Sequence, residues 1–104
     1  MDIQEQIKQQ VERNPILLFM KGTPAMPQCG FSQRAVQLLQ ACGATFESVN
    51  VLADDTVRDG VKRFSNWPTI PQLYINGKFV GGSDIMMELY QKGELEKMVA
   101  EVAR

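Results

Sequence analysis

The most reactive side chains available to this sequence are its two cysteines, Cys29 and Cys42. Histidine is absent, so neither a Ser–His nor a Cys–His pair can form, and no imidazole can bind a metal or act as a general base. Any chemistry must therefore use thiol, carboxylate, amine or backbone groups. The surroundings of each cysteine indicate which of the two is the better candidate.

Cys29 follows a segment rich in proline and glycine and directly precedes a stretch with the apolar spacing of a helix. A cysteine at the first turn of a helix faces free backbone N–H groups and the positive end of the helix dipole, which favour the thiolate. The thiolate is the form that attacks disulfides and binds metals. We therefore interpret Cys29 as a nucleophile or a metal ligand, in preference to a small buried core residue.

Cys42 lies on the apolar face of the same predicted helix, at its C-terminal end, where the helix dipole disfavours a thiolate. We therefore expect Cys42 to be a core residue. At 1.5 Å per residue, the helix would separate the two cysteines by about 20 Å. A disulfide between them would require this helix to unfold or shift.

The residue three positions after Cys29 is Ser32, so the chain has no C-x-x-C redox motif. A lone thiolate cannot resolve a mixed disulfide within its own site, and the second thiol must come from another molecule. We interpret Ser32 as an ordinary residue of the first helical turn rather than as a catalytic group.

The composition is that of a globular protein: 44% of the 104 residues are hydrophobic, 22% are charged, and the net charge is −1. The length fits a single domain over residues 1–104. The charge and the lack of a basic run argue against nucleic-acid binding, and no apolar stretch approaches the roughly 20 residues that span a bilayer. With a polar N-terminus and only two cysteines, we expect a cytoplasmic protein with free thiols.

Apolar periodicity predicts alternating helices and strands along the chain. The predicted helices follow Asp2, Gly30, Asp54 and Gly82, and Gly93 divides the last one into two. The predicted strands cover residues 16–20, 45–51, 73–75 and 78–80. Helix is excluded over residues 67–71, because two prolines lie three positions apart.

The order of predicted elements is therefore α-β-α-β-α-β-β-α-α. The first strand–helix–strand unit requires a parallel pair of strands with a right-handed crossover. Asn76-Gly77 favours a tight hairpin, which requires an antiparallel pair. Together these units predict an α/β fold, a four-stranded mixed sheet flanked by helices on both faces.

Four short motifs resemble those of the monothiol glutaredoxins, and the first is Cys29-Gly30-Phe31-Ser32, which is similar to the active-site motif of that family. The other three occur in the family's order and spacing: Lys21-Gly22-Thr23-Pro24, Trp67-Pro68-Thr69-Ile70-Pro71-Gln72 and Gly81-Gly82-Ser83-Asp84. The resemblance covers essentially the whole chain, and the short form is similar to the bacterial members. It implies the thioredoxin fold (glutaredoxin-like) with an extra N-terminal helix.

The resemblance implies that the chain binds glutathione, which carries two carboxylates, an ammonium and a thiol. Lys21 and Arg58 correspond to the family's cationic contacts for the carboxylate at the glycine end. Ser83 and Asp84 correspond to the pair that receives the γ-glutamyl end. Backbone N–H groups at a helix start suit that carboxylate, and the side chain of Asp84 suits the ammonium.

The motif around Pro71 contributes a further expected contact. Pro71 resembles the cis-proline of this fold. A cis bond there would let Ile70 present its backbone to glutathione as an extended strand does. We assign Trp67, in the same motif, only a local packing role.

The resemblance also implies a 2Fe-2S cluster, which needs four ligands, normally thiolates. One chain offers only the thiolate of Cys29, so two chains and two glutathione molecules would complete the set. The cluster would then bridge a homodimer and be labile, which suits delivery to apo iron–sulfur proteins. A BolA-like protein is a further implied partner, in place of one subunit.

The same site suggests an alternative function, a glutathione-dependent thiol–disulfide oxidoreductase with Cys29 as its nucleophile. Seven residues separate Lys21 from Cys29, a longer loop than in the dithiol relatives, and this would shift glutathione relative to the thiolate. We therefore expect weak turnover and favour the cluster carrier.

Overall fold

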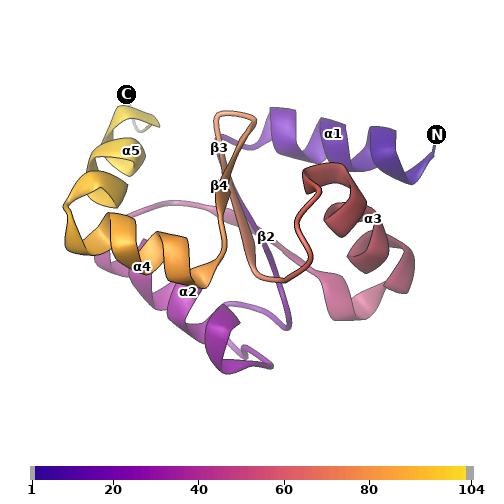
Figure 1. Cartoon of the computed structure of the whole chain (residues 1–104), viewed down its shortest axis with the longest axis horizontal. Coiled ribbons are helices and arrows are strands. Elements are labelled where there is room, and N and C mark those ends of the chain that lie inside the picture. The colour runs from indigo at the N-terminus through magenta and orange to yellow at the C-terminus, as the bar shows by residue number, and fades with distance from the viewer. Residues whose placement is uncertain (1, 103–104) are drawn as a thin grey trace.

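A computed structural model describes residues 2–102, and residues 1, 103 and 104 lie outside this description. The predicted order of helices and strands is confirmed (Figure 1). The elements are α1 (Ile3–Arg13), β1 (Ile16–Met20), α2 (Gly30–Ala41), β2 (Glu47–Asn50), the short 3-10 helix η1 (Val51–Ala53), α3 (Asp55–Ser65), β3 (Gln72–Ile75), β4 (Lys78–Gly81), α4 (Ser83–Gln91) and α5 (Glu94–Val102).

The second strand is shorter than predicted at both ends: it begins at Glu47, and it ends at Asn50 because the chain turns into η1 at Val51. The side chain of Asn50 caps this turn by accepting a hydrogen bond from the backbone N–H of Leu52 at 3.0 Å. A side-chain cap of this kind competes with continuation of the strand. The alternation of apolar residues in the sequence does not reveal this cap.

The four strands form one mixed sheet in the order β2-β1-β3-β4. β1 pairs parallel with β2, with α2 as the long connection that a parallel pair requires. β1 and β3 are antiparallel, as are β3 and β4, and Asn76 and Gly77 both adopt the positive φ of their hairpin turn. The predicted mixed sheet is therefore confirmed.

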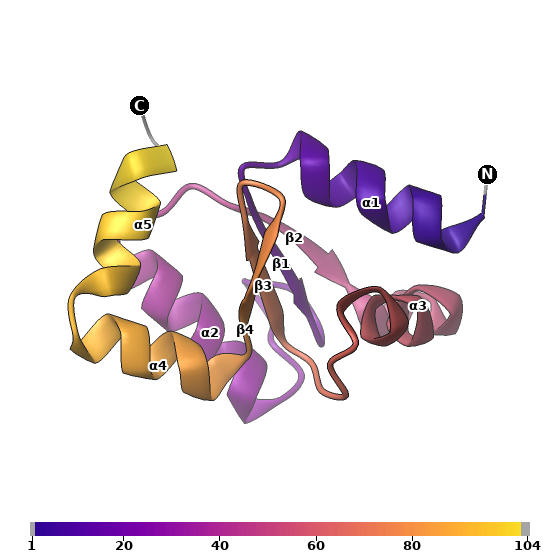
Figure 2. The same cartoon turned by 45° about the horizontal axis from the view of Figure 1, so that its top comes forward.

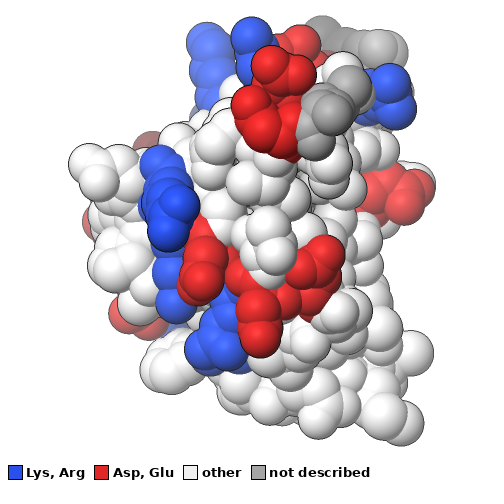
Figure 3. Space-filling view, turned by 90° about the vertical axis from the view of Figure 1, so that its right-hand side faces the viewer, with Lys and Arg blue, Asp and Glu red and all other residues white. Residues whose placement is uncertain are grey.

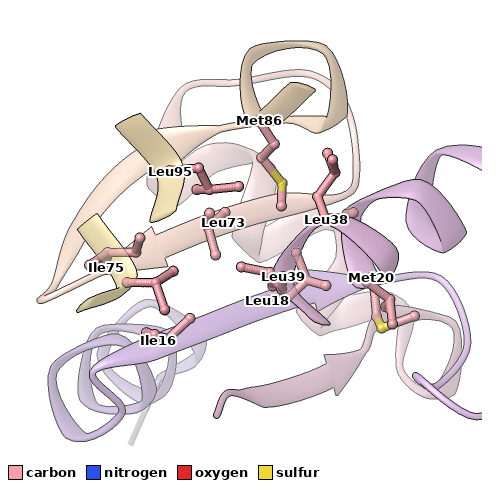
Figure 4. Close-up of a cluster of buried hydrophobic side chains, with 12 residues drawn as sticks. Ile16, Leu18, Met20, Leu38, Leu39, Leu73, Ile75, Met86 and Leu95 are labelled. Atoms are coloured by element: carbon pink, nitrogen blue, oxygen red, sulfur yellow. The ribbon is translucent and has the colours of Figure 1, made fainter. Parts of the chain in front are cut away.

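Helices cover both faces of this sheet, with α1 and α3 on one face and α2, α4 and α5 on the other (Figures 1 and 2). All five residues of β1 are buried, because alternate side chains enter opposite cores. Ile16, Leu18 and Met20 pack with the α2, α4 and α5 side (Figure 4). Leu17 and Phe19 pack with the α1 and α3 side.

The strand pairing brings distant parts of the sequence to one edge of the sheet. Phe19, near the end of β1, pairs with Gln72 at the start of β3. Gly81, at the end of β4, pairs with Leu73. The loop that leads to α2, the turn before β3 and the start of α4 consequently meet at this edge.

Charges of both signs are interleaved on the face that carries α1 and α3 (Figure 3). The ion pair between Lys8 and Glu12 is 3.9 Å long and largely exposed, so it contributes little stability. Positive and negative potentials partly cancel on this face. None of the helices within residues 2–102 combines the length and apolar character of a membrane span.

We predict that Leu39→Ala lowers the free energy of unfolding by about 2–5 kcal/mol, because a fully buried side chain leaves a cavity when it is truncated. Gln37→Ala, on the exposed side of the same helix, serves as the control and should change stability by less than about 0.5 kcal/mol. Urea unfolding of both variants measures the difference. Equal effects would show that α2 is not packed as described.

Candidate functional site

Cys29 is the N-cap residue of α2, with an extended backbone at φ −153° and ψ 155°. Its Sγ accepts a hydrogen bond from the backbone N–H of Ser32 at 3.3 Å. The predicted position at the first helical turn is therefore confirmed. The sulfur takes the place of the oxygen that caps most helices, and it pairs with one of the N–H groups that the first turn leaves free.

Ser32 contributes more than the ordinary first-turn residue that the sequence suggested. It is fully buried, and its Oγ lies 3.3 Å from Cys29 Sγ. The same Oγ accepts a hydrogen bond from the backbone N–H of Lys21 at 3.0 Å. Since that lone pair is engaged, the hydroxyl hydrogen is available to donate to a thiolate at Cys29.

The balance of these contacts lowers the pKa of the Cys29 thiol. Partial burial acts in the opposite direction and raises the pKa, but it is outweighed by the hydrogen bonds from the side chain and backbone of Ser32. The backbone N–H of Phe31 and the positive charge of Lys21 lower the pKa further. Cys29 is therefore partly ionised at a lower pH than an ordinary cysteine.

The loop between Lys21 and Cys29 is held in one shape by its own hydrogen bonds. Thr23 and Met26 exchange backbone hydrogen bonds of 3.2 and 3.0 Å, and Gln28 N–H donates to Lys21 C=O at 2.9 Å. Gly22 has a φ of +91°, and a Cβ there would lie 2.6 Å from the carbonyl oxygen of Met26. Only glycine fits this position, so the loop delivers Cys29 to a defined place.

A pocket of about 370 Å³ lies at the same edge of the sheet. Its walls come from the end of β1, the starts of α2 and α4, the end of α3 and the turn before β3. The lining residues are Lys21, Phe31, Lys62, Trp67, Pro68, Thr69, Ile70, Pro71, Gly82, Ser83, Asp84 and Ile85. The Ile70–Pro71 bond is cis, as the family resemblance implied.

The structure brings four of the five residues expected to contact glutathione to this pocket: Lys21, Ile70, Ser83 and Asp84. The fifth, Arg58, is not among the lining residues. Lys62, one turn further along α3, supplies the cation there instead. Sequence reasoning missed Lys62, although its spacing of four from Arg58 places both on one face of the helix. Cys29 is not among the lining residues, but two of them, Lys21 and Phe31, act on its thiol.

The opposite end of the pocket is the start of α4. Gly82 is the N-cap of this helix and makes no side-chain capping bond, so the first N–H groups of the helix have no side-chain partner. The carboxylate of Asp84, at the same helix start, is 87% exposed and lies 3.6 Å from the guanidinium of Arg34. The Arg34 guanidinium is also 5.8 Å from the centre of the Phe31 ring. The pocket thus presents cations at one end and a helix start with a carboxylate at the other.

Trp67 does more than the predicted local packing. Its ring packs against Phe79 at 5.6 Å, and it also lines the pocket. Within residues 2–102, Trp67 Nε1 and Ser83 Oγ are buried side-chain atoms without a hydrogen-bond partner. Because buried polar atoms are nearly always paired, these two are available to a bound molecule or to water.

Cys42 packs against the hydrophobic core, as the sequence predicted. Burial raises the pKa of its thiol, and the carboxylate of Glu96 raises it further. Cys29 and Cys42 cap opposite ends of α2 and both are free thiols. Across residues 2–102 there is no group of three or more Cys, Asp or Glu side chains that could hold a metal. A metal bound at Cys29 would need ligands from outside the chain.

We predict that Ser32→Ala raises the pKa of the Cys29 thiol, because the variant loses a hydrogen bond that stabilises the thiolate. The rate of alkylation by iodoacetamide, measured against pH in a Cys42→Ser background, should therefore reach its midpoint at higher pH in Ser32→Ala. Gln33→Ala, at the neighbouring exposed position, is the control and should leave the midpoint unchanged. Identical profiles for all three proteins would contradict the role given to Ser32.

Comparison with known proteins identifies the family. The family model for glutaredoxin matches residues 16–80. An uncharacterized monothiol glutaredoxin, ycf64-like, from Synechocystis sp. is 61% identical over 97 residues, which are 93% of this chain and 90% of that protein. The solution structure of reduced poplar apo GrxS14 has a TM-score of 0.83 and 48% identity, and the match covers 97% of this chain and 93% of that one.

A third relative links the fold to a ligand. The crystal structure of a buckwheat glutaredoxin–glutathione complex has a TM-score of 0.85 and 26% identity to this chain, with 97% of this chain and 90% of that one covered. The fold of the present chain and its activated thiol, Cys29 at the start of α2, agree with the sequence comparisons. The chain belongs to the glutaredoxin family, and within it to the monothiol glutaredoxins.

Proposed function

We propose that this protein binds glutathione and carries a labile 2Fe-2S cluster between two subunits, in the assembly or transfer of iron–sulfur clusters. The observation that carries the proposal is the single activated sulfur. Cys29 has a lowered pKa and caps the end of α2 whose Phe31 lines the pocket, whereas Cys42 has a raised pKa and caps the far end of α2. A subunit of this kind must obtain every further thiolate from another molecule.

The pocket has the chemical groups that glutathione requires. Lys21 and Lys62 line one end and suit the carboxylate at the glycine end, with Arg58 one turn before Lys62 on the same helix. At the other end, the free N–H groups at Ser83 and the carboxylate of Asp84 suit the γ-glutamyl group.

Between these ends, the turn at Ile70 supports the proposed backbone pairing with the tripeptide. Ile70 precedes the cis-proline and lines the pocket. An extended peptide that lies along such a backbone gains main-chain hydrogen bonds. Glutathione bound in this orientation would have its cysteine near the centre of the pocket, whose lining includes Phe31, two residues after Cys29. The buckwheat glutaredoxin–glutathione complex supports this ligand for the shared fold.

The cluster is cargo in this proposal, and the ligand count sets the assembly. Four thiolates hold a 2Fe-2S cluster. Each subunit contributes Cys29 and one bound glutathione, so two subunits complete the set. The residues near Cys29 in the chain include Met26 and Phe31, whose side chains are 68% and 56% exposed and offer apolar surface to a second subunit.

A cluster held in this way would be labile, since half of its ligands are small molecules in exchange with solution. This lability suits transfer to apo iron–sulfur proteins. A BolA-like protein could take the place of one subunit and supply its own ligands. We place this activity in the cytoplasm, where thiols stay reduced.

The lowered pKa of Cys29 also favours a second candidate function, the reduction of mixed disulfides. The Cys29 thiolate would attack the glutathione sulfur of a protein–glutathione disulfide and release the protein thiolate. A second glutathione thiolate would then attack the Cys29–glutathione disulfide, regenerating Cys29 and releasing glutathione disulfide. In the net exchange one glutathione thiolate is oxidised, the protein sulfur is reduced to a thiolate, and both glutathione sulfurs leave as glutathione disulfide.

Anaerobic reconstitution with iron, sulfide and glutathione tests the carrier function. We expect a coloured dimer that depends on glutathione, and loss of the colour in Cys29→Ser, because the ligating sulfur is absent. Cys42→Ser is the matched control and should keep the colour. Visible absorption and size-exclusion chromatography measure both properties. A coloured species that forms without glutathione, or that is lost in Cys42→Ser, would contradict the ligand assignment.

A mixed-disulfide reduction assay on the same samples separates the two candidate functions. Rapid turnover together with no coloured dimer would favour the oxidoreductase. Weak turnover together with a stable coloured dimer would favour the carrier. Cys29→Ser is the blank in this assay, since both functions require its sulfur.

We predict that Asp84→Asn raises the Kd for glutathione about two- to fivefold, the range expected when one exposed ion pair is lost. Arg34→Gln should lower the Kd, because the guanidinium of Arg34 competes with the ligand ammonium for the same carboxylate. Calorimetric titration measures both. A glutathione analogue without the α-amino group is the control, and neither substitution should change its Kd by this route.

A further inference from the structure

Gln72 is a polar residue in the interior of the protein, and its side-chain amide is fully hydrogen-bonded. The residue is 0% exposed. Its Nε2 donates to the carbonyl oxygens of Trp67 and Thr69 at 3.2 and 3.1 Å. Its Oε1 accepts a hydrogen bond from the hydroxyl of Tyr74 at 3.2 Å. Both donors and the acceptor are therefore used within a single local network.

The two carbonyls that Gln72 binds belong to the turn over residues 67–71, which supplies five of the twelve residues that line the pocket. This turn lies outside the helices and strands of the described chain. Pro68 and Pro71 have no backbone N–H, so the turn is poor in donors of its own. The amide of Gln72 supplies the donors that a neighbouring strand or helix would otherwise provide.

Tyr74 fixes the orientation of this amide. Residues two apart on a strand share a face, so the side chains of Gln72 and Tyr74 lie side by side on the α1 and α3 side of β3. Burial raises the pKa of Tyr74 to about 12, so its hydroxyl keeps its proton at neutral pH. A protonated hydroxyl donates to Oε1, and this leaves Nε2 directed at the two carbonyls.

We propose that Gln72 is a positioning residue for glutathione, and that its buried amide holds the pocket wall formed by residues 67–71 in the shape that receives the tripeptide. Gln72 does not itself line the pocket. It acts through Trp67 and Thr69, which do, and Tyr74 acts through Gln72. This inference rests on the proposed function, because it assumes that glutathione occupies the pocket.

Titration with S-methylglutathione tests the proposal, because this ligand has no free thiol and cannot form a disulfide with Cys29. Gln72→Met keeps the length of the side chain but removes its donors. We expect the Kd to rise about tenfold, because the carbonyl oxygens of Trp67 and Thr69 both lose their hydrogen-bond donor. Tyr74→Phe removes only the hydroxyl and should raise the Kd by a smaller factor, about threefold. If Gln72→Met fails to fold, Tyr74→Phe by itself tests the proposal.

Leu95→Ala provides the matched control. Leu95 is fully buried in α5, on the opposite side of the sheet, and truncating it destabilises the protein without touching residues 67–71. Its Kd should stay within twofold of that of the unaltered protein, even where its Tm falls as far as that of Gln72→Met. Trp67 is the only tryptophan in the chain, so its fluorescence reports on this wall. Its emission should move to longer wavelength in Gln72→Met and stay unchanged in Leu95→Ala.

The outcomes separate this inference from the proposed function. If the unaltered protein does not bind S-methylglutathione, the proposed function fails and the role of Gln72 fails with it. If the unaltered protein binds but folded Gln72→Met and Tyr74→Phe bind equally well, only the role of Gln72 is overturned. If Leu95→Ala lost as much affinity as Gln72→Met, the positioning role would also be overturned, because the loss would then follow from lower stability alone.

Discussion

The hydrogen bonds between Cys29 and Ser32 at the start of α2 are the interaction on which the rest of the site depends. Ser32 can stabilise a thiolate only because its own oxygen is held by the backbone N–H of Lys21. That N–H is in place because the loop from Lys21 to Cys29 closes on itself around Gly22. The reactive sulfur, the first helical turn and the end of β1 are therefore fixed together, and none of them acts as an independent motif.

The order of strands in the sheet explains why the other motifs join this one. β1 lies between β2 and β3, so the antiparallel pairing with β3 brings the turn before Gln72 alongside the end of β1. The hairpin to β4 returns the chain to the same edge, where α4 begins. Segments far apart in the sequence thus form one pocket, because the end of β1, the start of β3 and the end of β4 lie together in the sheet.

Sequence patterns were sufficient for the elements and for most of the pocket, because apolar spacing, proline positions and Asn76-Gly77 act locally. They were insufficient where a side chain pairs with a distant backbone group. The burial of Ser32 and the hydrogen bond from Gly22 N–H to Asn50 Oδ1 each depend on a partner brought near by the fold. The amide of Gln72 pairs with residues only two to five positions away, but the sequence does not show that this side chain is buried. Lys62 rather than Arg58 lines the pocket, and the spacing of the residues along α3 does not specify which of the two does so.

A single thiolate suits both candidate functions. The two functions differ in the second sulfur, which is part of a disulfide in one and a glutathione thiolate in the other. A disulfide sulfur accepts the electron pair of Cys29 and leads to exchange. A glutathione thiolate beside Cys29 repels it and gains stability only when a cation lies between the two. In the proposed cluster, iron would supply that cation. The position of glutathione in the pocket therefore decides the chemistry, because it sets whether the two sulfurs lie within bonding distance or leave room for a metal. The walls that position the tripeptide, rather than Cys29 itself, would then determine which reaction this protein performs.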